Sequence, residues 1–346
     1  MTVPKIRISI LGLSHDHIWG ELFHLRQNLD LAEIVSVYDP HPELQQRFRE
    51  EMNGQGTIVP DPEDILGDES IHAVFVFGDN RASAAWTAEA ARREKAVMVE
   101  KPLAADLAGA SALQEVISSD SSPLIMVNWP FAWWPSLQEA LRLAKEGAIG
   151  ELWSVHYRAA HAGPDVIGCS QPFVEWLFDP ARNGGGALMD YCGYGATLAA
   201  FLLGAPDSLM GWGANLGKPL LPAEDNATLL LRYPRAQATV EASWTQCGEL
   251  TSYVTAIYGT EGTLLVAPFD GELRRATSAY PHGEPISVAP LTPSRKNAVS
   301  HFLSVLRGED TLHPLCDPAL AQLCQAILET GKNALEERRE IKVILS

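Results

Sequence analysis

The sequence predicts an α/β protein with two domains: an amino-terminal doubly wound parallel sheet and a carboxy-terminal part dominated by antiparallel strands. Short apolar runs alternate with helical segments in the first third of the chain, which is typical of βαβ units. Long β-rich runs joined by turns lie in the last third, which is typical of hairpins and a meander. Because 346 residues are too many for one hydrophobic core, we expect domains at residues 1–127 and 128–346.

The amino-terminal domain is expected to contain six strands with helices between them. Each strand is a short apolar run that ends in a turn or a polar residue, at residues 6–11, 34–38, 57–59, 73–77, 97–99 and 124–127. Helical spacing of large residues, or an alanine-rich composition, predicts helices at residues 18–29, 42–52, 61–66, 82–94 and 107–118. Strands and helices that alternate in this way favour one doubly wound parallel sheet.

The carboxy-terminal domain mixes helices with longer strands. We expect helices at residues 136–145, 187–203, 296–306 and 317–336, and strands at residues 152–159, 227–233, 236–245, 252–258 and 340–345. Apolar and polar side chains alternate along residues 236–245, so one face of that strand is expected to be apolar. A loop rich in Gly, Pro and His, residues 160–172, could be a lid over a site.

The composition argues against several classes of partner. The formal charge is −17, with 26 Lys and Arg against 43 Asp and Glu, which argues against nucleic acid or an anionic membrane surface. The five cysteines form no Cys-x-x-Cys pair, so neither a disulfide framework nor a zinc knuckle is expected. The amino terminus enters a strand without the apolar stretch of a signal peptide, and no run approaches a membrane span. We therefore expect a soluble cytoplasmic protein.

The first strand is followed by the turn GLSHDH, Gly12 to His17, where a sheet of this kind would hold a pyrophosphate. The turn keeps the first glycine of the G-x-G-x-x-G fingerprint, and Ser14 and His17 stand at the second and third glycine positions. A serine hydroxyl, or a histidine near the start of a helix, can contact a phosphate. We count His15, between them, as a further cofactor-binding candidate.

Asp39 ends the second strand and is the better sign of a nucleotide. A carboxylate at this position can accept hydrogen bonds from the two ribose hydroxyls of an adenosine and would repel a 2′-phosphate. NAD is therefore expected in preference to NADP. The alternative is that Asp39-Pro40 is only a turn after a strand.

His15, Asp16 and His17 also raise the question of a metal. Alternating positions on a tight turn do not converge easily on one ion, and no glutamate or cysteine cluster elsewhere in the sequence obviously completes a site. We therefore expect no catalytic metal.

The stretch VMVEKP, Val97 to Pro102, brings Glu100 and Lys101 to the end of a buried strand. Such strand ends line the ligand crevice of open α/β sheets, and a lysine there can polarise a reacting oxygen. The alternative is an ordinary strand that ends in a surface salt bridge.

Two stretches suggest contacts with a substrate. Trp129, Trp133 and Trp134 crowd one segment at the exit from the first domain, which predicts an aromatic wall, a packed interdomain hinge, or both. His161 belongs to the possible lid, and we count it with these tryptophans as a substrate-binding candidate.

The stretch GGGALMDYCGYGATLAAFLLG, Gly184 to Gly204, predicts a turn followed by a helix. Asp190 and Tyr194 are four residues apart and therefore share a face of that helix. A carboxylate and a phenol beside a closely approaching ligand could form an acid/base pair. The alternative is a helix that merely packs through its glycines.

The motifs of this chain, and the order in which they occur, resemble those of the Gfo/Idh/MocA oxidoreductase family. The motifs are the Gly12 turn, Tyr38-Asp39-Pro40, Asn80 before an alanine-rich helix, Glu100-Lys101-Pro102, GAIGELWSVHYR at 147–158, GGGALMDYCGYGA at 184–196 and YGTEGTL at 258–264. The resemblance covers nearly the whole chain. It implies a Rossmann domain that binds NAD(H) or NADP(H), followed by an α/β domain with a large, open, mostly antiparallel sheet.

The resemblance also implies roles for single residues. It implies that Lys101 contacts substrate and nicotinamide, that Asn80 and Glu100 lie at the cofactor, and that the Lys101-Pro102 bond is cis. Many family members have histidine where Tyr194 stands, whereas a subset similar to glucose-fructose oxidoreductase and dihydrodiol dehydrogenase has tyrosine. This chain resembles the tyrosine-using type, although the family's Thr-Pro-Asn-x-x-His stretch keeps only Asn80 here.

The function expected on this basis is an NAD-dependent oxidoreductase. It would transfer a hydride between nicotinamide and a secondary alcohol or ketone of a sugar, cyclitol or related polyol. Two alternatives stay open: a metabolite sensor that binds nucleotide without turnover, and an enzyme that uses bound NAD in redox-neutral elimination or glycoside hydrolysis.

The expected proton carrier is Tyr194, with its pKa lowered by the ammonium of Lys101 and with Asp190 as the rival base. Apolar residues on both faces of 252–258, such as Tyr253 and Val254, suggest an exposed apolar sheet face. We therefore expect a homodimer or homotetramer that forms through the carboxy-terminal sheet.

Overall fold

The computed structural model describes residues 4–119 and 122–344. Its first sheet has six parallel strands in the order β3-β2-β1-β4-β5-β6. The strands are β1 (Ile6–Leu11), β2 (Ala32–Tyr38), β3 (Thr57–Ile58), β4 (Ala73–Val76), β5 (Ala96–Glu100) and β6 (Ile125–Asn128). The strand order reverses between β1 and β4, and sheets of this type bind ligands outside the carboxyl ends of the strands at that point. The predicted doubly wound parallel sheet is confirmed.

Helices cover this sheet because each crossover between parallel strands has to bury an apolar stripe against it. They are α1 (His17–Arg26), α2 (Pro42–Glu51), α3 (Glu63–Leu66), α4 (Asn80–Arg92) and α5 (Leu107–Ile117). Capping carboxylates fix where α4 and α5 begin. Asp79 accepts a hydrogen bond from the backbone N–H of Ala82, and Asp106 accepts one from the backbone N–H of Gly109, each at 2.8 Å.

The second sheet has nine strands in the order β14-β13-β12-β11-β7-β10-β9-β8-β15. Among the described residues only β7 and β10 pair in parallel, and the other neighbours are antiparallel. The strands are β7 (Leu152–Ala160), β8 (Ser208–Ala214), β9 (Asn226–Arg232), β10 (Gln237–Ser243), β11 (Val254–Gly259), β12 (Gly262–Ala267), β13 (Glu272–Thr277), β14 (Glu284–Pro285) and β15 (Ile341–Lys342). The predicted large, mostly antiparallel sheet is confirmed.

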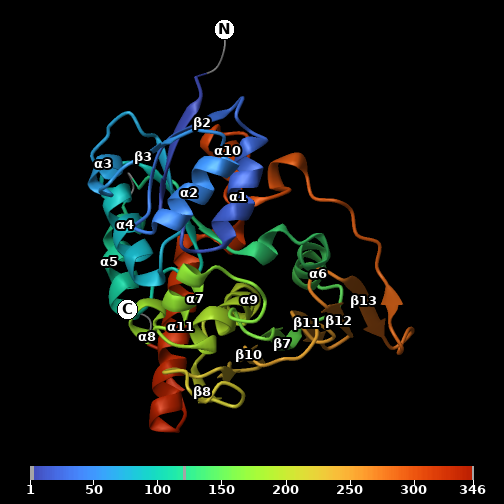
Figure 1. The fold of residues 1–346 in the computed structure, drawn as a ribbon. Helices are drawn as coiled ribbons and strands as arrows, with labels where there is room; N and C mark the ends of the chain where they lie inside the picture. Colours follow the sequence, from blue (N-terminus) through green and yellow to red (C-terminus); the bar gives the residue numbers. More distant parts are fainter. Residues whose placement is uncertain (1–3, 120–121, 345–346) are drawn as a thin grey trace.

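The helices of the second half hold the two sheets together. They are α6 (Pro135–Lys145), α7 (Gln171–Leu177), α8 (Pro180–Asn183), α9 (Gly193–Leu203), α10 (Ala298–Leu306) and α11 (Pro318–Glu337), with short turns η1 (Pro130–Trp133), η2 (Leu188–Cys192), η3 (Pro293–Arg295) and η4 (Pro314–Cys316). Helix α10 returns to the first domain beside α1 (Figure 1), where the ring of Phe302 lies 5.6 Å from that of Phe75. Helix α11 contacts α5 and β6 of the first domain as well as α9 and β8 of the second. The division of the chain at residue 127 stays a prediction.

The predicted regular helix at 187–203 is wrong in its first turn. Residues Leu188–Cys192 form a π-helix, and a regular α-helix begins only at Gly193. A π-helical turn holds more residues than an α-helical turn, so it changes which side chains share a face, and such turns are frequent at functional sites.

Strands β8, β12, β13 and β14 were not predicted. In β8, Gly211 and Gly213 interrupt the apolar pattern. Both glycines lie against α11: a Cβ on Gly211 would be 2.3 Å from a methyl group of Leu335, and one on Gly213 would be 2.5 Å from the other. Two smaller differences concern loops and ends. Helix α7 begins inside the predicted loop 160–172, and the predicted last strand is reduced to β15, with Leu345 outside the described residues.

One helical stretch of the described chain, Pro180–Leu203, is long and apolar enough to span a membrane by length and composition, which the sequence analysis did not expect. Most of it is buried inside the protein, as a core helix would be. The five cysteines form no disulfide with one another.

Candidate active site

A cavity of about 80 Å³ lies beside the carboxyl end of β5, between the two domains. Its lining residues are Asp16, His17, Lys101, His161, Pro164, Ile167, Cys169, Phe173, Leu177, Asp190, Tyr191, Tyr194 and Tyr253. The cavity therefore combines a lysine, two carboxylates, two histidines and three phenols. Typical pockets for small ligands measure about 300–1,000 Å³, so a sugar with a nicotinamide requires the surrounding segments to move apart.

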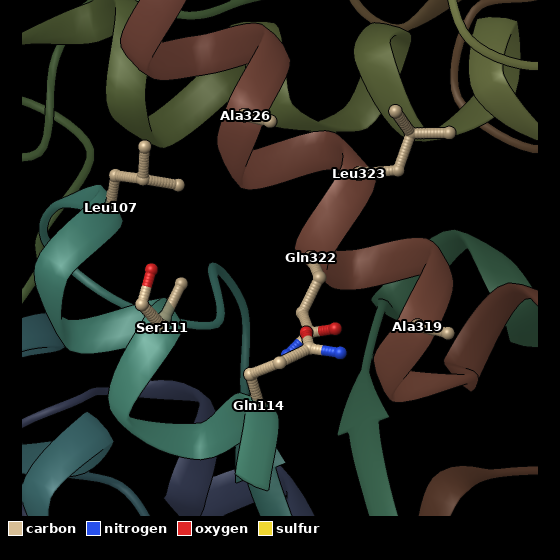
Figure 2. A pocket seen from close by; sticks show the side chains of 8 residues that line it. Leu107, Ser111, Gln114, Ala319, Gln322, Leu323 and Ala326 are labelled. Carbon is tan, nitrogen blue, oxygen red and sulfur yellow. The ribbon is translucent and has the colours of Figure 1, made fainter. Parts of the chain in front are cut away.

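A second cavity, of about 200 Å³, lies between α5 and α11 and is shown in Figure 2. Gln114 and Gln322 extend towards each other across it, and the other lining side chains are small or apolar. Because no titratable group lines this cavity, it offers no acid, base or charged group for catalysis. The cavity at Lys101 is the candidate active site.

Lys101 and Asp190 form a buried ion pair. The Nζ of Lys101 donates to Asp190 Oδ1 at 2.7 Å, and the two residues are only 3% and 6% exposed. The other carboxylate oxygen of Asp190 accepts a hydrogen bond from Trp244 Nε1 at 3.1 Å. Lys101 follows β5 directly, and its bond to Pro102 is cis, as the sequence predicted. The structure thus brings together two of the predicted catalytic residues.

Tyr194 lies one turn further along, in an aromatic environment. Its ring is 5.2 Å from those of Trp129 and Phe131 and stacks parallel to Tyr157 at 6.2 Å. Burial, followed by the negative charges that Tyr253 and Glu100 can carry, raises the pKa of the Tyr194 phenol well above its ordinary value.

The expected lowering of the pKa of Tyr194 by Lys101 is therefore wrong. The Nζ of Lys101 lies 5.0 Å from the centroid of the Tyr194 ring, over its face, and bonds to the carboxylate of Asp190 instead. Burial outweighs the effect of one ammonium that is already paired. In the free protein the Tyr194 phenol is neutral and is a proton donor.

Two further tyrosines line the cavity and were missed by the sequence analysis. The hydroxyl of Tyr253 donates to that of Tyr191 at 2.8 Å. Burial raises the pKa of both Tyr253 and Tyr191 well above the ordinary value of a phenol. Tyr191 stands next to Asp190 in the motif, but on a regular α-helix the two would face different directions. The π-helix brings Asp190, Tyr191 and Tyr194 to one cavity, and no sequence signal indicated it.

Of the four predicted substrate-binding residues, one lines the cavity and three do not. His161 lines the cavity with its ring 4.8 Å from that of Tyr191, and burial lowers its pKa. Trp129, Trp133 and Trp134 do not line it. They pack against Tyr194, against His301 and His313, and against Tyr253 and Phe269, respectively. These contacts fit a packed hinge, and a role of the three tryptophans in substrate binding stays a prediction.

The turn after β1 packs closely against the end of β4. Gly12 has a φ of +90°, and a Cβ there would lie 2.5 Å from the backbone nitrogen of Gly78, so a glycine is required at this position. Helix α1 begins at His17, whose backbone N–H donates to Nδ1 of His15 at 3.4 Å, and the N–H of Ile18 donates to the carbonyl oxygen of His15 at 3.0 Å. The turn lies at the reversal point of the sheet, and its predicted contact with a pyrophosphate stays a prediction.

Asp39, by contrast, is held by its own turn. It is 1% exposed, and its carboxylate accepts hydrogen bonds from the backbone N–H of Leu13 at 2.6 Å and from the backbone N–H and ring Nδ1 of His41 at 2.8 Å. The alternative interpretation of Asp39 as a turn residue thus accounts for all of these contacts.

The segment around α7 and α8 covers the glycine turn and the start of α4. Trp176 Nε1 donates to the carbonyl oxygen of Ser14 at 3.0 Å, and the backbone N–H of Ser170 donates to the Asp16 carboxylate at 2.6 Å. The amide of Asn80 donates to the carbonyl and to the side-chain oxygen of Asn183 at 3.0 and 2.9 Å. Ser14 and Asn80 are therefore buried against the second domain at 4% and 3% exposure.

Glu100, the remaining predicted cofactor residue, is 3% exposed. It bonds to Nδ1 of His17 at 3.0 Å and accepts from Nδ2 of Asn128 at 2.8 Å. His15 lies beside His17, with ring centroids 4.6 Å apart. The reason given for expecting no metal therefore does not hold, because a glutamate distant in sequence does join these two histidines.

Comparison with known proteins gives two family matches. A model described as the oxidoreductase family with an NAD-binding Rossmann fold matches residues 6–128, and a model described as the GFO/IDH/MocA C-terminal domain matches residues 137–265. Together they cover most of the chain.

Similar individual proteins are sugar dehydrogenases. The chain is 27% identical over 208 residues to a D-xylose 1-dehydrogenase [NADP(+)] of Haloarcula marismortui, covering 59% of this chain and 56% of that protein. It is 28% identical over 325 residues to a D-apiose dehydrogenase of Paraburkholderia graminis, covering 89% and 82%. A levoglucosan dehydrogenase structure with NADH and L-sorbose matches with a TM-score of 0.83 at 18% identity, covering 99% of this chain and 100% of that one, which supports the fold.

Proposed function

Because the chain belongs to the Gfo/Idh/MocA oxidoreductase family, we propose that it transfers a hydride between NAD and a secondary alcohol or ketone of a sugar, cyclitol or related polyol. The observation that carries the proposal is the buried pair of Lys101 and Asp190 in a cavity at the carboxyl ends of the parallel strands. The names of the similar sugar dehydrogenases support the substrate class.

The residues that would hold the dinucleotide are the Gly12 turn, His17 at the start of α1, and Asp39 and Asn80 beside the same crevice. Bound nicotinamide supplies or accepts the hydride. The carboxylate of Asp39 would repel a 2′-phosphate, so we propose NAD rather than NADP. One similar protein is named for NADP(+) and another structure contains NADH, so the preference has to be measured.

The chain's own groups would handle charge and protons. In the reducing direction the ketone oxygen gains negative charge, which the ammonium of Lys101 stabilises while Asp190 holds that ammonium in position. The Tyr194 phenol, kept neutral by burial, donates the proton that converts this oxygen into a hydroxyl. The phenol becomes a phenolate in this step, and in the oxidising direction that phenolate would take the proton from the substrate hydroxyl. Asp190 is the rival proton carrier.

The test is a screen of sugars, polyols and their keto forms with NAD(H) and NADP(H), followed by nicotinamide absorbance. Tyr194→Phe should lower turnover by about 100-fold to 10,000-fold with cofactor affinity unchanged, because it removes only the proton carrier. Lys101→Met should be at least as damaging. Tyr233→Phe, which removes a buried hydroxyl outside the cavity, should leave turnover unchanged.

Other outcomes would point to a different role. If Tyr194→Phe keeps normal turnover while Asp190→Asn abolishes it, the proton passes through the carboxylate. Turnover without free NADH would identify the redox-neutral chemistry. Binding of nucleotide and sugar without any turnover would identify a sensor and would overturn the proposed reaction.

We also propose a homodimer or homotetramer that forms through the open face of the second sheet. Residues paired across neighbouring strands form one row on that face, and they run from Met210 through Leu230, Thr239, His156 and Ala256 to Leu265. Met210, Leu230 and Leu265 are 50%, 43% and 38% exposed, and Trp212 beside them is 55% exposed. The exposed apolar side chains at the two ends of this row suit a second subunit, whereas its middle contains Thr239 and His156. A cytoplasmic location remains a prediction.

A further inference from the structure

His15, His17 and Glu100 form a cluster to which the proposed transfer of charge and protons assigns no role, and His17 is in addition a candidate for holding the dinucleotide. One nitrogen of each histidine and one carboxylate oxygen of Glu100 all lie within 4.8 Å of one another. The histidines belong to the turn between β1 and α1, whereas Glu100 ends β5. The fold therefore joins ligand types that the sequence keeps far apart.

The two carboxylates at the cluster have few partners. Among the described residues, no Lys or Arg forms an ion pair with Glu100 or with the neighbouring Glu21, and His17 is the one ionic partner of Glu100. A carboxylate oxygen of Glu21, Oε2, is buried with no hydrogen-bond partner. A bound cation would compensate the carboxylate of Glu100, which is 3% exposed.

Neighbouring groups orient the cluster. Asn128 donates to Oε2 of Glu100 at 2.8 Å, which leaves Oε1 directed at His17, and Trp133 Nε1 donates to Asn128 Oδ1 at 3.0 Å. Partners of this kind, which fix a ligating carboxylate without binding the metal themselves, are typical of metal sites.

The two histidines are suited to act as ligands. The ring of His15 packs against Phe173 and Trp176, with centroids 4.9 and 5.5 Å away. His15 is itself buried, at 2% exposure. The Nδ1 of His17 lies 3.0 Å from Oε1 of Glu100. Two ligands each about 2.1 Å from one ion would be about 3.0–3.4 Å apart.

We propose that His15, His17 and Glu100 bind one divalent transition-metal ion such as Zn²⁺ or Ni²⁺. Two imidazoles and one carboxylate suit these ions, whereas Mg²⁺ and Ca²⁺ prefer oxygen ligands. Three protein ligands leave at least one coordination position open. His17 also lines the cavity that contains Lys101, so the ion sits at the wall of the candidate active site. The proposal is independent of the proposed reaction, since it concerns binding to the protein alone.

The test is calorimetric titration of the untagged full chain, freed of metal by a chelator, with Zn²⁺, Ni²⁺ and Mg²⁺ in turn. We expect one Zn²⁺ or Ni²⁺ per chain and no detectable Mg²⁺ binding. His17→Ala and Glu100→Gln should each weaken Zn²⁺ binding by at least about 10-fold. Cobalt substitution should give a visible absorption band that is lost in both variants.

His156→Ala is the matched control. His156 pairs with Glu241 at 3.1 Å, and its side chain is 40% exposed, almost the same as the 39% of His17. It lies on the second sheet, away from the cluster, so its variant should bind Zn²⁺ as the parent does. Circular dichroism confirms that each variant is folded. Parent binding no tighter than about 100 µM, or equal affinity in His17→Ala and His156→Ala, would overturn the metal site.

Discussion

Replacing Lys101 with methionine should expose the energetic consequence of the buried ion pair. Lys101 and Asp190 are 3% and 6% exposed, and their charged atoms are 2.7 Å apart. Removing one partner of a buried pair leaves an uncompensated charge and typically costs about 3–5 kcal/mol. Asp190 would keep its hydrogen bond from Trp244, so we expect Lys101→Met to lower the free energy of unfolding by about 3 kcal/mol.

The companion variant Asp190→Asn should cost less, about 1–3 kcal/mol, because the amide oxygen can still accept a hydrogen bond from Lys101. The double variant removes both charges together. Its cost should be smaller than the sum of the single costs, with an interaction energy of about 1–3 kcal/mol.

The assay is urea unfolding followed by tryptophan fluorescence, with the slope of free energy against urea compared among variants. An exposed pair, Arg235 and Glu151, provides the control: their side chains are 85% and 75% exposed at a separation of 3.1 Å. Double replacement there should give an interaction energy below about 1 kcal/mol. Additive costs at Lys101 and Asp190, within about 0.5 kcal/mol, would refute the reasoning.

Three further predictions concern the interdomain contact, acid stability and assembly. Gly184→Ala should lower the free energy of unfolding by at least about 3 kcal/mol, because φ is +97° and a Cβ would lie 1.8 Å from the carbonyl oxygen of Ala105. Gly147→Ala is the control in the same urea assay. It should cost less, because Gly147 has a φ of +78° but a Cβ there would have no atom within 4 Å. Burial lowers the pKa of His313 to about 4, whereas its pKa in the unfolded state is about 6.5. Between these two pH values the unfolded state binds more protons than the folded state. The free energy of unfolding should therefore fall as the pH drops from about 6.5 to 4. His313→Asn, which keeps an acceptor for the backbone, should flatten that part of the profile of unfolding free energy against pH, and an unchanged profile would contradict the assignment. Light scattering at micromolar concentration should give a multiple of the 37.7 kDa chain mass. Trp212→Glu should lower the measured mass towards that of one chain, because it places a charge on the exposed sheet face. A parent protein that is already monomeric would exclude assembly through this face.

Much of the fold could be predicted because it follows from local patterns. The apolar runs that became β1, β4 and β5 are buried on both faces, and alternation of strand and helix leaves few other topologies. Lys101 and Asp190 were each predicted as site residues from their motifs, and the cavity contains both, but their ion pair was not predicted. Strand β8 escaped prediction because its glycines are explained only by the helix that packs on them.

The sequence by itself determined the parallel sheet, the antiparallel character of the second sheet, and Lys101, Asp190 and Tyr194 at the candidate site, since these depend on periodicity and on motifs contiguous in the chain. Only the tertiary structure decided how those groups are used. The π-helix turned Tyr191 into the cavity, burial raised the pKa of Tyr194 despite the nearby ammonium, and α7 closed over the glycine turn. The end of β5 carried Glu100 to His15 and His17. Each of these depends on desolvation or on contacts between residues distant in sequence, which no local pattern records.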